Sequence, residues 1–140
     1  MTEFHIKSGS WHELKLDAQL IRRDVFIREQ GISEHDEWDD QDPVSIHFVL
    51  YDQKKAAATA RLLENNSIGR VAVLKDYRGQ GVGLVMMKAI IECAKQQNRR
   101  NLKLSSQVQA IPFYERLGFT TDGVEYLDCG IPHIDMFLNL

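Results

Sequence analysis

Cysteine and proline are scarce in this sequence, which has 2 cysteines and 3 prolines among its 140 residues. Cys93 and Cys129 lie far apart and form no C-x-x-C pair, so they indicate neither a disulfide framework nor a structural zinc site. No apolar run approaches the roughly 18 residues that a membrane-spanning helix needs. The first residues also lack the basic-then-apolar order of a signal peptide. We therefore expect a reduced, cytoplasmic protein that uses no metal and contacts no membrane.

The remaining composition is that of an ordinary globular protein. Hydrophobic residues make up 44% of the chain, charged residues 26%, and there are 9 glycines. These values exclude a disordered, collagen-like or low-complexity chain. A chain of this length usually forms one domain and buries about two thirds of its unfolded surface, which is enough for a core of its own. We expect a single domain over residues 1–140.

Positive charge is also in short supply, because 17 Lys and Arg against 20 Asp and Glu leave a formal net charge of −3. This balance argues against a general nucleic-acid-binding protein. The charges are unevenly spread. Residues 29–42 hold seven acidic residues and no Lys or Arg, whereas residues 61–103 hold nine basic and three acidic residues. Two interpretations stay open: solvated faces, or a basic region for a polyanionic small ligand beside an acidic region for a cationic one.

Hydrophobic periodicity predicts an α/β protein of mixed, α+β type with one mostly antiparallel sheet. A helix should begin after the N-cap Ser10 and end near Gln30, and a second helix should span about 81–97. The acidic segment between Glu29 and Asp42 has no period and predicts a loop. The remaining expected elements are strands at 4–7, 46–51, 56–63, 68–74, 102–105, 119–121 and 134–138, with a short helix around 110–117. The 68–74 and 102–105 strands flank the long helix, so they should be parallel.

The most informative segment is the glycine-rich loop before the long helix, which reads Arg78-Gly-Gln-Gly-Val-Gly83. Alternating glycines let a ligand approach the backbone, and free N–H groups at a helix N-terminus bind anions. Arg78 adds a forked, permanent cation. The loop lacks the Lys-Ser/Thr of a Walker A loop and the spacing and acidic residue of a Rossmann fingerprint. We expect it to bind a diphosphate rather than only to permit tight packing.

Two motifs in register resemble the GNAT superfamily of acyl-CoA-dependent N-acyltransferases. The loop at 78–83 resembles the family's R/Q-x-x-G-x-G/A, which binds the pyrophosphate of acetyl-CoA, and residues 107–119 resemble N-x-x-A-x-x-F-Y-x-x-x-G-F. Residues 25–31 and 130–135 further resemble a small bacterial ElaA-like branch. The resemblance covers nearly the whole chain. It implies a twisted, mostly antiparallel sheet of six to seven strands with a splayed parallel pair and about four helices.

The resemblance also implies an N-acetyltransferase that moves an acetyl group from acetyl-CoA to a primary amine, small or peptidyl, by direct attack in a ternary complex. Tyr114 stands where the family's general acid protonates the departing thiolate. Gln107 replaces the family's usual Asn. Family members often dimerise, so a homodimer is one expectation for the assembly. The implied cofactor-binding residues are Val71, Ala72, Val73, Arg78, Gly79, Gln80, Gly81, Val82, Gly83, Gln107 and Tyr114.

The catalytic base is left open by the sequence. Many relatives carry a Glu two residues before the first valine of the pre-loop strand, where this chain has Gly69. Glu29, His47 and His133 are the candidates for the base or for acceptor binding. Each has a structural alternative: Glu29 at a helix end, His133 in a loop, and His47 on a strand face, where the alternation favours a structural role. The acidic segment lies near the acceptor in this architecture, which suggests the hypothesis of a cationic amine substrate.

Two other function classes also stay open. A non-catalytic acyl-CoA-binding or sensing module would keep the cleft without turnover. Gly69, in place of the Glu of many relatives, leaves this class open, whereas the retained Tyr114 argues against it. A nucleotide-binding domain of another fold would bind ATP or NAD in preference to CoA. Turnover of acetyl-CoA and the choice among these three ligands distinguish the classes.

Overall fold

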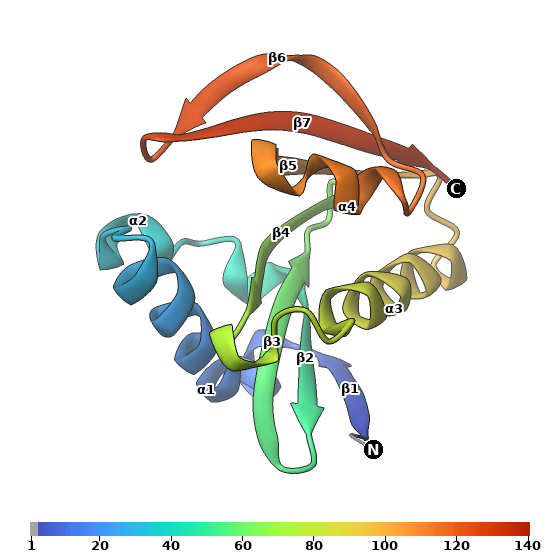
Figure 1. The fold of residues 1–140 in the computed structure, drawn as a ribbon. Coiled ribbons are helices and arrows are strands. Elements are labelled where there is room, and N and C mark those ends of the chain that lie inside the picture. The colour runs from blue at the N-terminus through green and yellow to red at the C-terminus, as the bar shows by residue number, and fades with distance from the viewer. Residues whose placement is uncertain (1–2) are drawn as a thin grey trace.

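In the computed structural model, which describes residues 3–140, the chain forms one seven-stranded sheet (Figure 1). The strand order is β1-β2-β3-β4-β5-β7-β6, and only the β4–β5 pair is parallel. This arrangement confirms the predicted mixed α/β fold with a parallel pair. The strands are β1 (Phe4–Gly9), β2 (Ile46–Asp52), β3 (Lys55–Leu62), β4 (Ser67–Val73), β5 (Asn101–Gln107), β6 (Thr120–Asp128) and β7 (Ile131–Asn139).

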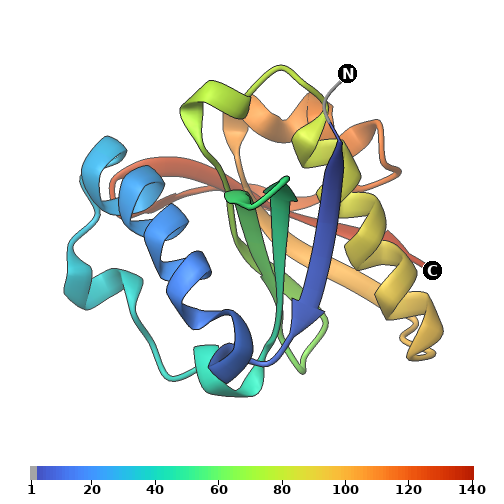
Figure 2. The ribbon, with the colours of Figure 1, turned by 90° about the horizontal axis from the view of Figure 1, so that it is seen from below.

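Helices cover both faces of the sheet, with α1 on one face of β1–β4 and α3 on the other (Figure 2). Ser10 and Glu13 form a capping box at the start of α1, each side chain accepting from the other residue's backbone N–H. No helix within residues 3–140 has the length and apolarity needed to cross a membrane. The helices are α1 (Trp11–Arg22), which continues as the π-helix η1 (Arg23–Glu29), α2 (Glu34–Glu37), α3 (Val82–Gln96), α4 (Ile111–Glu115), and the 3-10 turns η2 (Asp42–Val44), η3 (Lys75–Tyr77) and η4 (Val108–Ala110).

The two faces of the sheet carry separate apolar clusters, and β4 contributes to both. Ile68 packs in the cluster under α3, whereas Ala72 packs in the cluster under α1. A regular strand would point residues four apart to the same face. The β3–β4 register shifts between Thr59 and Arg61, and Arg70 has a φ of 52°, in the left-handed region. β4 therefore contains a β-bulge, which reverses its facing and bends it.

The bulge coincides with the point where β4 leaves β5. The two strands pair only through Ser67 with Lys103 and Ile68 with Leu104. From Gly69 to Val73 the edge of β4 that faces β5 has no strand partner. The splayed parallel pair that the resemblance implied is therefore present, and its physical origin lies in the bulge.

Two expectations about segments were wrong. The acidic segment is not a plain loop, because Ser33 accepts a hydrogen bond from the Asp36 N–H and so starts the short helix α2, and η2 follows at Asp42. The last two strands are also much longer than the predicted 119–121 and 134–138. Every residue of β6 is exposed, so the strand shows no apolar alternation and is held by its backbone pairing with β7.

Candidate active site

The gap between β4 and β5 opens into a cleft of about 1140 Å³. One wall consists of β4, the glycine loop and the first turn of α3, and the other of β5, α4 and the tip of the β6–β7 hairpin. The end of η1 and the end of α2 line a third side. All predicted cofactor residues line this cleft except Gln80, whose side chain donates instead to the Asp76 carbonyl at 2.8 Å.

The glycines of the loop have two different local roles. Gly79 and Gly81 each have a φ of 78°, which an L side chain rarely adopts, and no atom lies within 4 Å of the position of an added Cβ. Gly83 lies in the first turn of α3, where an added Cβ would meet Cζ of Phe113 at 3.3 Å. The first two glycines thus leave the loop backbone open to the cleft, and the third also lets α3 pack against α4.

The N-terminus of α3 points free backbone donors at the cleft. Gly81 occupies the N-cap position and supplies no capping side chain. The first intrahelical bond runs from the Val85 N–H to the Gly81 carbonyl at 3.1 Å, so the N–H groups of residues 82–84 have no acceptor within the helix. These residues line the cleft. The helix dipole adds partial positive charge there, and the site suits an anion.

Arg78 is already engaged by other residues of the protein. Its Nη1 and Nη2 donate to the two carboxylate oxygens of Glu29, each at 2.7 Å, and its Nε donates to the Val73 carbonyl at 3.0 Å. The ion pair lowers the pKa of Glu29. Sequence reasoning listed Glu29 for the acceptor side and missed this pair, because the two residues are 49 positions apart. Glu29 is therefore the partner of the loop arginine in this structure.

Tyr114 lies in the opposite wall, with its side chain packed among aromatic rings. Phe113 and Phe119 contact it edge to face, with ring centroids 5.0 and 5.9 Å away. The residue is only 8% exposed, and burial raises its pKa to about 12. The phenol therefore keeps its proton at neutral pH while it faces the cleft.

The three acceptor-side candidates have different surroundings. His133 lines the cleft beside Gln107, its neighbour in the β5–β7 register. Gln107 also makes a long contact, 3.4 Å, to the side chain of Gln30. His47 does not reach the cleft: it is 1% exposed, its Nε2 lies 2.8 Å from the Asp42 carbonyl, and burial lowers its pKa. Glu29 and His133 therefore stay at the site, and His47 has the structural role that its strand alternation favoured.

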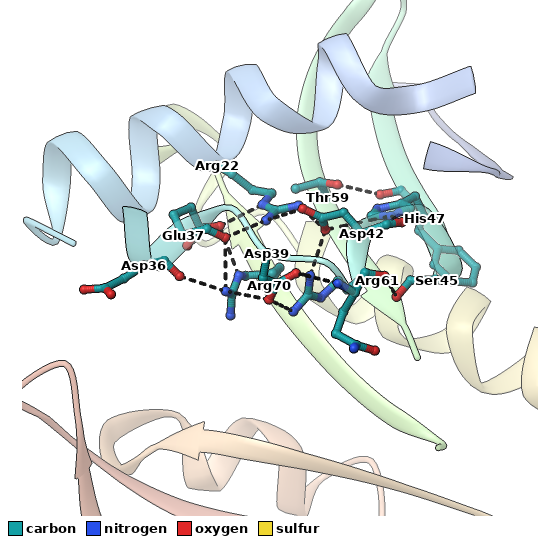
Figure 3. Close-up of polar contacts among 12 residues, drawn as sticks. Arg22, Asp36, Glu37, Asp39, Asp42, Ser45, His47, Thr59, Arg61 and Arg70 are labelled. Carbon is teal, nitrogen blue, oxygen red and sulfur yellow. Dashed lines mark hydrogen bonds and ion pairs between the residues drawn. The ribbon is translucent and has the colours of Figure 1, made fainter. Parts of the chain in front are cut away.

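A network of buried ion pairs accounts for much of the acidic segment (Figure 3). Arg22 donates to Glu37 at 2.7 Å and to Asp42 at 2.8 Å, and all three side chains are nearly inaccessible to solvent. Arg61 donates to the same Asp42 at 2.8 Å and to Asp39 at 2.6 Å. The carboxylates therefore neutralise arginines of α1 and β3.

Arg70, the residue at the bulge, joins this network to the cleft. Its Nη2 donates to Asp39 at 3.2 Å and to the Glu37 carbonyl at 3.1 Å, and its Nε lies 3.2 Å from the Glu37 carboxylate. Both Arg70 and Glu37 line the cleft. The acidic segment as a whole is therefore no surface for a cationic amine. Glu29 and Asp36 are the acidic residues of the segment that are both exposed and at the cleft, and Glu29 is paired with Arg78.

The comparisons with known proteins agree with this geometry. Residues 27–140 match the model of the acetyltransferase (GNAT) domain. The chain belongs to the GNAT family. It is 36% identical over 124 residues to YjcF of Bacillus subtilis (strain 168), which is named an uncharacterized N-acetyltransferase, and the match covers 86% of this chain and 89% of YjcF.

Solved structures of GNAT-type proteins superpose closely on this chain. Escherichia coli ElaA gives a TM-score of 0.86 at 27% identity, covering 96% of this chain and 99% of ElaA. An acyl-CoA N-acyltransferase from Pseudomonas aeruginosa gives 0.82 at 28% identity, covering 99% of each chain. The resemblance seen in the motifs is thus confirmed, and the GNAT fold excludes a nucleotide-binding domain of another fold. Family membership implies an acetyltransferase that binds acetyl-CoA and acts on an amine.

Proposed function

We propose that this GNAT protein transfers the acetyl group of acetyl-CoA to a primary amine, on a small molecule or a peptide, by direct attack in a ternary complex. The observation that supports this most is that one cleft holds both parts the reaction needs. The uncapped start of α3 with the open backbone of Gly79 and Gly81 offers an anion site, and the protonated Tyr114 faces it from the opposite wall.

The residues of the cleft fit acetyl-CoA along its length. The diphosphate would lie on the N–H groups of the loop and of residues 82–84. The unpaired edge of β4, over residues 69–73, offers backbone donors and acceptors to the pantetheine arm, which would add to the sheet as a strand does. The Gln107 side chain lines the same path. Bound in this way, acetyl-CoA supplies an acyl carbon activated as a thioester.

Tyr114 would act as the general acid. The amine nitrogen forms the new bond to the acetyl carbon as the carbon–sulfur bond breaks, and the departing sulfur needs a proton. A phenol whose pKa is raised to about 12 by burial holds a proton to give at neutral pH. Cys129 also lines the cleft, but desolvation and the nearby Asp128 and Asp36 raise the pKa of its thiol, which makes a nucleophilic thiolate scarce. Direct attack therefore suits the site better than an acyl-cysteine.

Replacement of Gly79 by Val tests the proposed anion site. The side chain at a φ of 78° strains the loop and covers its backbone, so we expect CoA affinity to fall at least tenfold in isothermal titration calorimetry. The matched control is Gly123→Val, because Gly123 has a φ of 86° and equally open space but lies in β6, outside the cleft. Gly123→Val should lower the free energy of unfolding about as much as Gly79→Val does and leave the affinity for CoA unchanged. Equal affinities in the two variants would contradict the site.

Release of free thiol from acetyl-CoA tests the activity itself. The wild-type protein should release thiol faster with a panel of primary amines, namely ethylamine, spermidine and lysine-containing peptides, than without amine. A non-catalytic CoA-binding module would bind CoA in calorimetry and show no amine-dependent release. Failure to bind CoA at all would overturn the proposed function.

A further inference from the structure

We propose, on the basis of the acetyl transfer argued above, that His133 is the general base that takes the proton from the acceptor ammonium. A primary amine is mostly protonated at neutral pH, so it needs a base before it can attack. β4 carries no carboxylate at the splay, where Gly69 and Arg70 stand. The base must therefore come from another wall of the cleft.

His133 lies where a base can serve the acid Tyr114. On β7 it is the register partner of Gln107, the last residue of β5, and from Gln107 the chain continues through η4 into α4, which carries Tyr114. The histidine and the tyrosine therefore belong to the same wall and line the same cleft. The phenol can supply the sulfur side of the reaction while the imidazole receives the proton of the nitrogen.

The contacts of His133 orient its ring and identify the nitrogen that donates. Nδ1 lies 2.7 Å from the carbonyl oxygen of Ile131, and because a carbonyl only accepts, this nitrogen carries the proton. In the neutral ring the basic lone pair is then on Nε2. The ring stacks on Tyr126 with centroids 6.2 Å apart and planes at 23°, and the Tyr126 hydroxyl donates to Asp135 at 2.6 Å. A neutral imidazole, oriented by its neighbours, is the form that a base requires.

Of the carboxylates that line the cleft, Asp36 and Asp128 are exposed, whereas Glu29 and Glu37 are engaged in ion pairs. Glu29 holds Arg78 through both carboxylate oxygens. Glu37 is 2% exposed and neutralises Arg22. The charged and titratable groups around the hairpin end of the cleft are Tyr126 and Asp128 of β6, Asp135 of β7, Cys129 in the turn, and Asp36 and Arg70 across the cleft.

The proton balance of the reaction gives each residue a defined task. The acceptor ammonium gives its first proton to Nε2 of His133, which frees the lone pair that forms the carbon–nitrogen bond. As the carbon–sulfur bond breaks, the Tyr114 hydroxyl gives its proton to the sulfur. The nitrogen then loses its second proton to the Tyr114 oxygen, which restores the phenol. His133 releases the first proton to solvent, so one proton leaves and one ends on the CoA thiol.

His133→Gln tests this assignment, because the amide can still donate to the Ile131 carbonyl but has no basic nitrogen. We expect kcat/KM for ethylamine at pH 7 to fall about 100-fold. For 2,2,2-trifluoroethylamine, whose ammonium is a much stronger acid and is already largely deprotonated, the loss should be less than tenfold. The affinity of His133→Gln for CoA, measured by calorimetry, should stay within twofold of the wild-type value. Such a result would also show that the variant is folded. The control is His5→Gln, a histidine of β1 that stacks on Tyr51 away from the cleft.

Two further results bear on the assignment. The acid limb of the pH–rate profile should disappear in His133→Gln. In His133→Ala, added imidazole should raise the activity at least tenfold over that of the same variant without imidazole. Equal losses with both amines, or an unchanged pH profile, would show a structural role and overturn the assignment while the acetyl transfer itself stands. If the wild-type protein binds CoA but releases no thiol with any amine, the proposed transfer fails and this inference fails with it.

Discussion

The pKa of the Tyr114 hydroxyl depends on the residues packed around it as well as on the phenol itself. An exposed tyrosine has a pKa near 10, and here burial among Phe113 and Phe119 raises it to about 12. A higher pKa makes the phenol a weaker acid but keeps it protonated throughout the neutral and mildly alkaline range. Because the raised pKa weakens the phenol as an acid, the proposed contribution of Tyr114 rests on holding its proton at the cleft at neutral pH rather than on acid strength.

Tyr114→Phe should separate catalysis from binding. We expect kcat/KM in the thiol-release assay to fall about 100-fold or more, because one general acid contributes on that order, while CoA affinity stays within twofold. The wild-type pH–rate profile should show no loss of activity from Tyr114 below about pH 10, since its pKa lies near 12. The control is Tyr51→Phe, whose hydroxyl donates to Asp17 away from the cleft. Activity of Tyr114→Phe within threefold of wild type would contradict its role as the acid.

The sequence revealed those site residues whose role is written into a local pattern. Gly79 and Gly81 stand out by spacing at a strand–helix junction, and in the structure both have left-handed φ values. Arg70 and Glu37 carry no such pattern. Their position at the cleft depends on a bulge in β4 and on ion pairs between residues 33 positions apart, and neither leaves a local signal.

At the scale of elements, the end of η1 contacts the glycine loop, where we propose that the diphosphate binds. Glu29 is the last residue of the π-helix η1. Short π-helical segments are rare and are frequently found at functional sites. Glu29 holds Arg78 by two hydrogen bonds of 2.7 Å, and Arg78 in turn occupies the Val73 carbonyl on the β4 edge. A diphosphate on the loop must share or replace this carboxylate, which has the same sign of charge.

Glu29→Gln should therefore strengthen CoA binding. A partly exposed ion pair contributes up to about 1 kcal/mol, so removal of the competing carboxylate should lower the Kd for CoA about three- to fivefold at low salt. The effect should shrink as salt is added. The control is Asp24→Asn, which removes a carboxylate of the same helix that pairs with Arg28 instead. Weaker binding in Glu29→Gln would instead mean that Glu29 orients Arg78 for the diphosphate.

Elements were predicted well where packing imposes a period and poorly where it does not. α3 is apolar on several sides because it packs against both the sheet and α4, and its start and end lie within a residue of the expected ones. β6 has exposed side chains throughout, so its length follows from backbone pairing with β7, which no hydrophobic pattern records. The short helix α2 depends on one cap residue, Ser33.

Across the whole molecule, the buried ion network joins the helical layer to the sheet next to the cleft. Arg22 comes from α1, Glu37 from α2, Asp42 from η2, Arg61 from β3 and Arg70 from β4, so five elements of the chain meet there (Figure 3). The rings of Trp11 and Trp38 lie 5.5 and 5.1 Å from the Arg22 guanidinium and shield it from water. Such a cluster stabilises the fold only when every charge keeps its partner, because an unpaired buried charge is costly.

Arg22→Met should lower the free energy of unfolding by about 3–5 kcal/mol, the cost of breaking a buried pair by removing one partner. Glu37 and Asp42 would remain buried with one arginine fewer, so the loss exceeds that of a surface pair. Urea denaturation followed by fluorescence of the two tryptophans measures it. Arg28→Met is the matched control, because Arg28 forms an exposed pair with Asp24 and should cost less than about 1 kcal/mol. The double variant Arg22→Met/Glu37→Gln should recover part of the loss, since it removes one of the unpaired charges. Similar losses in Arg22→Met and Arg28→Met would show that the network does not hold the helical layer on the sheet.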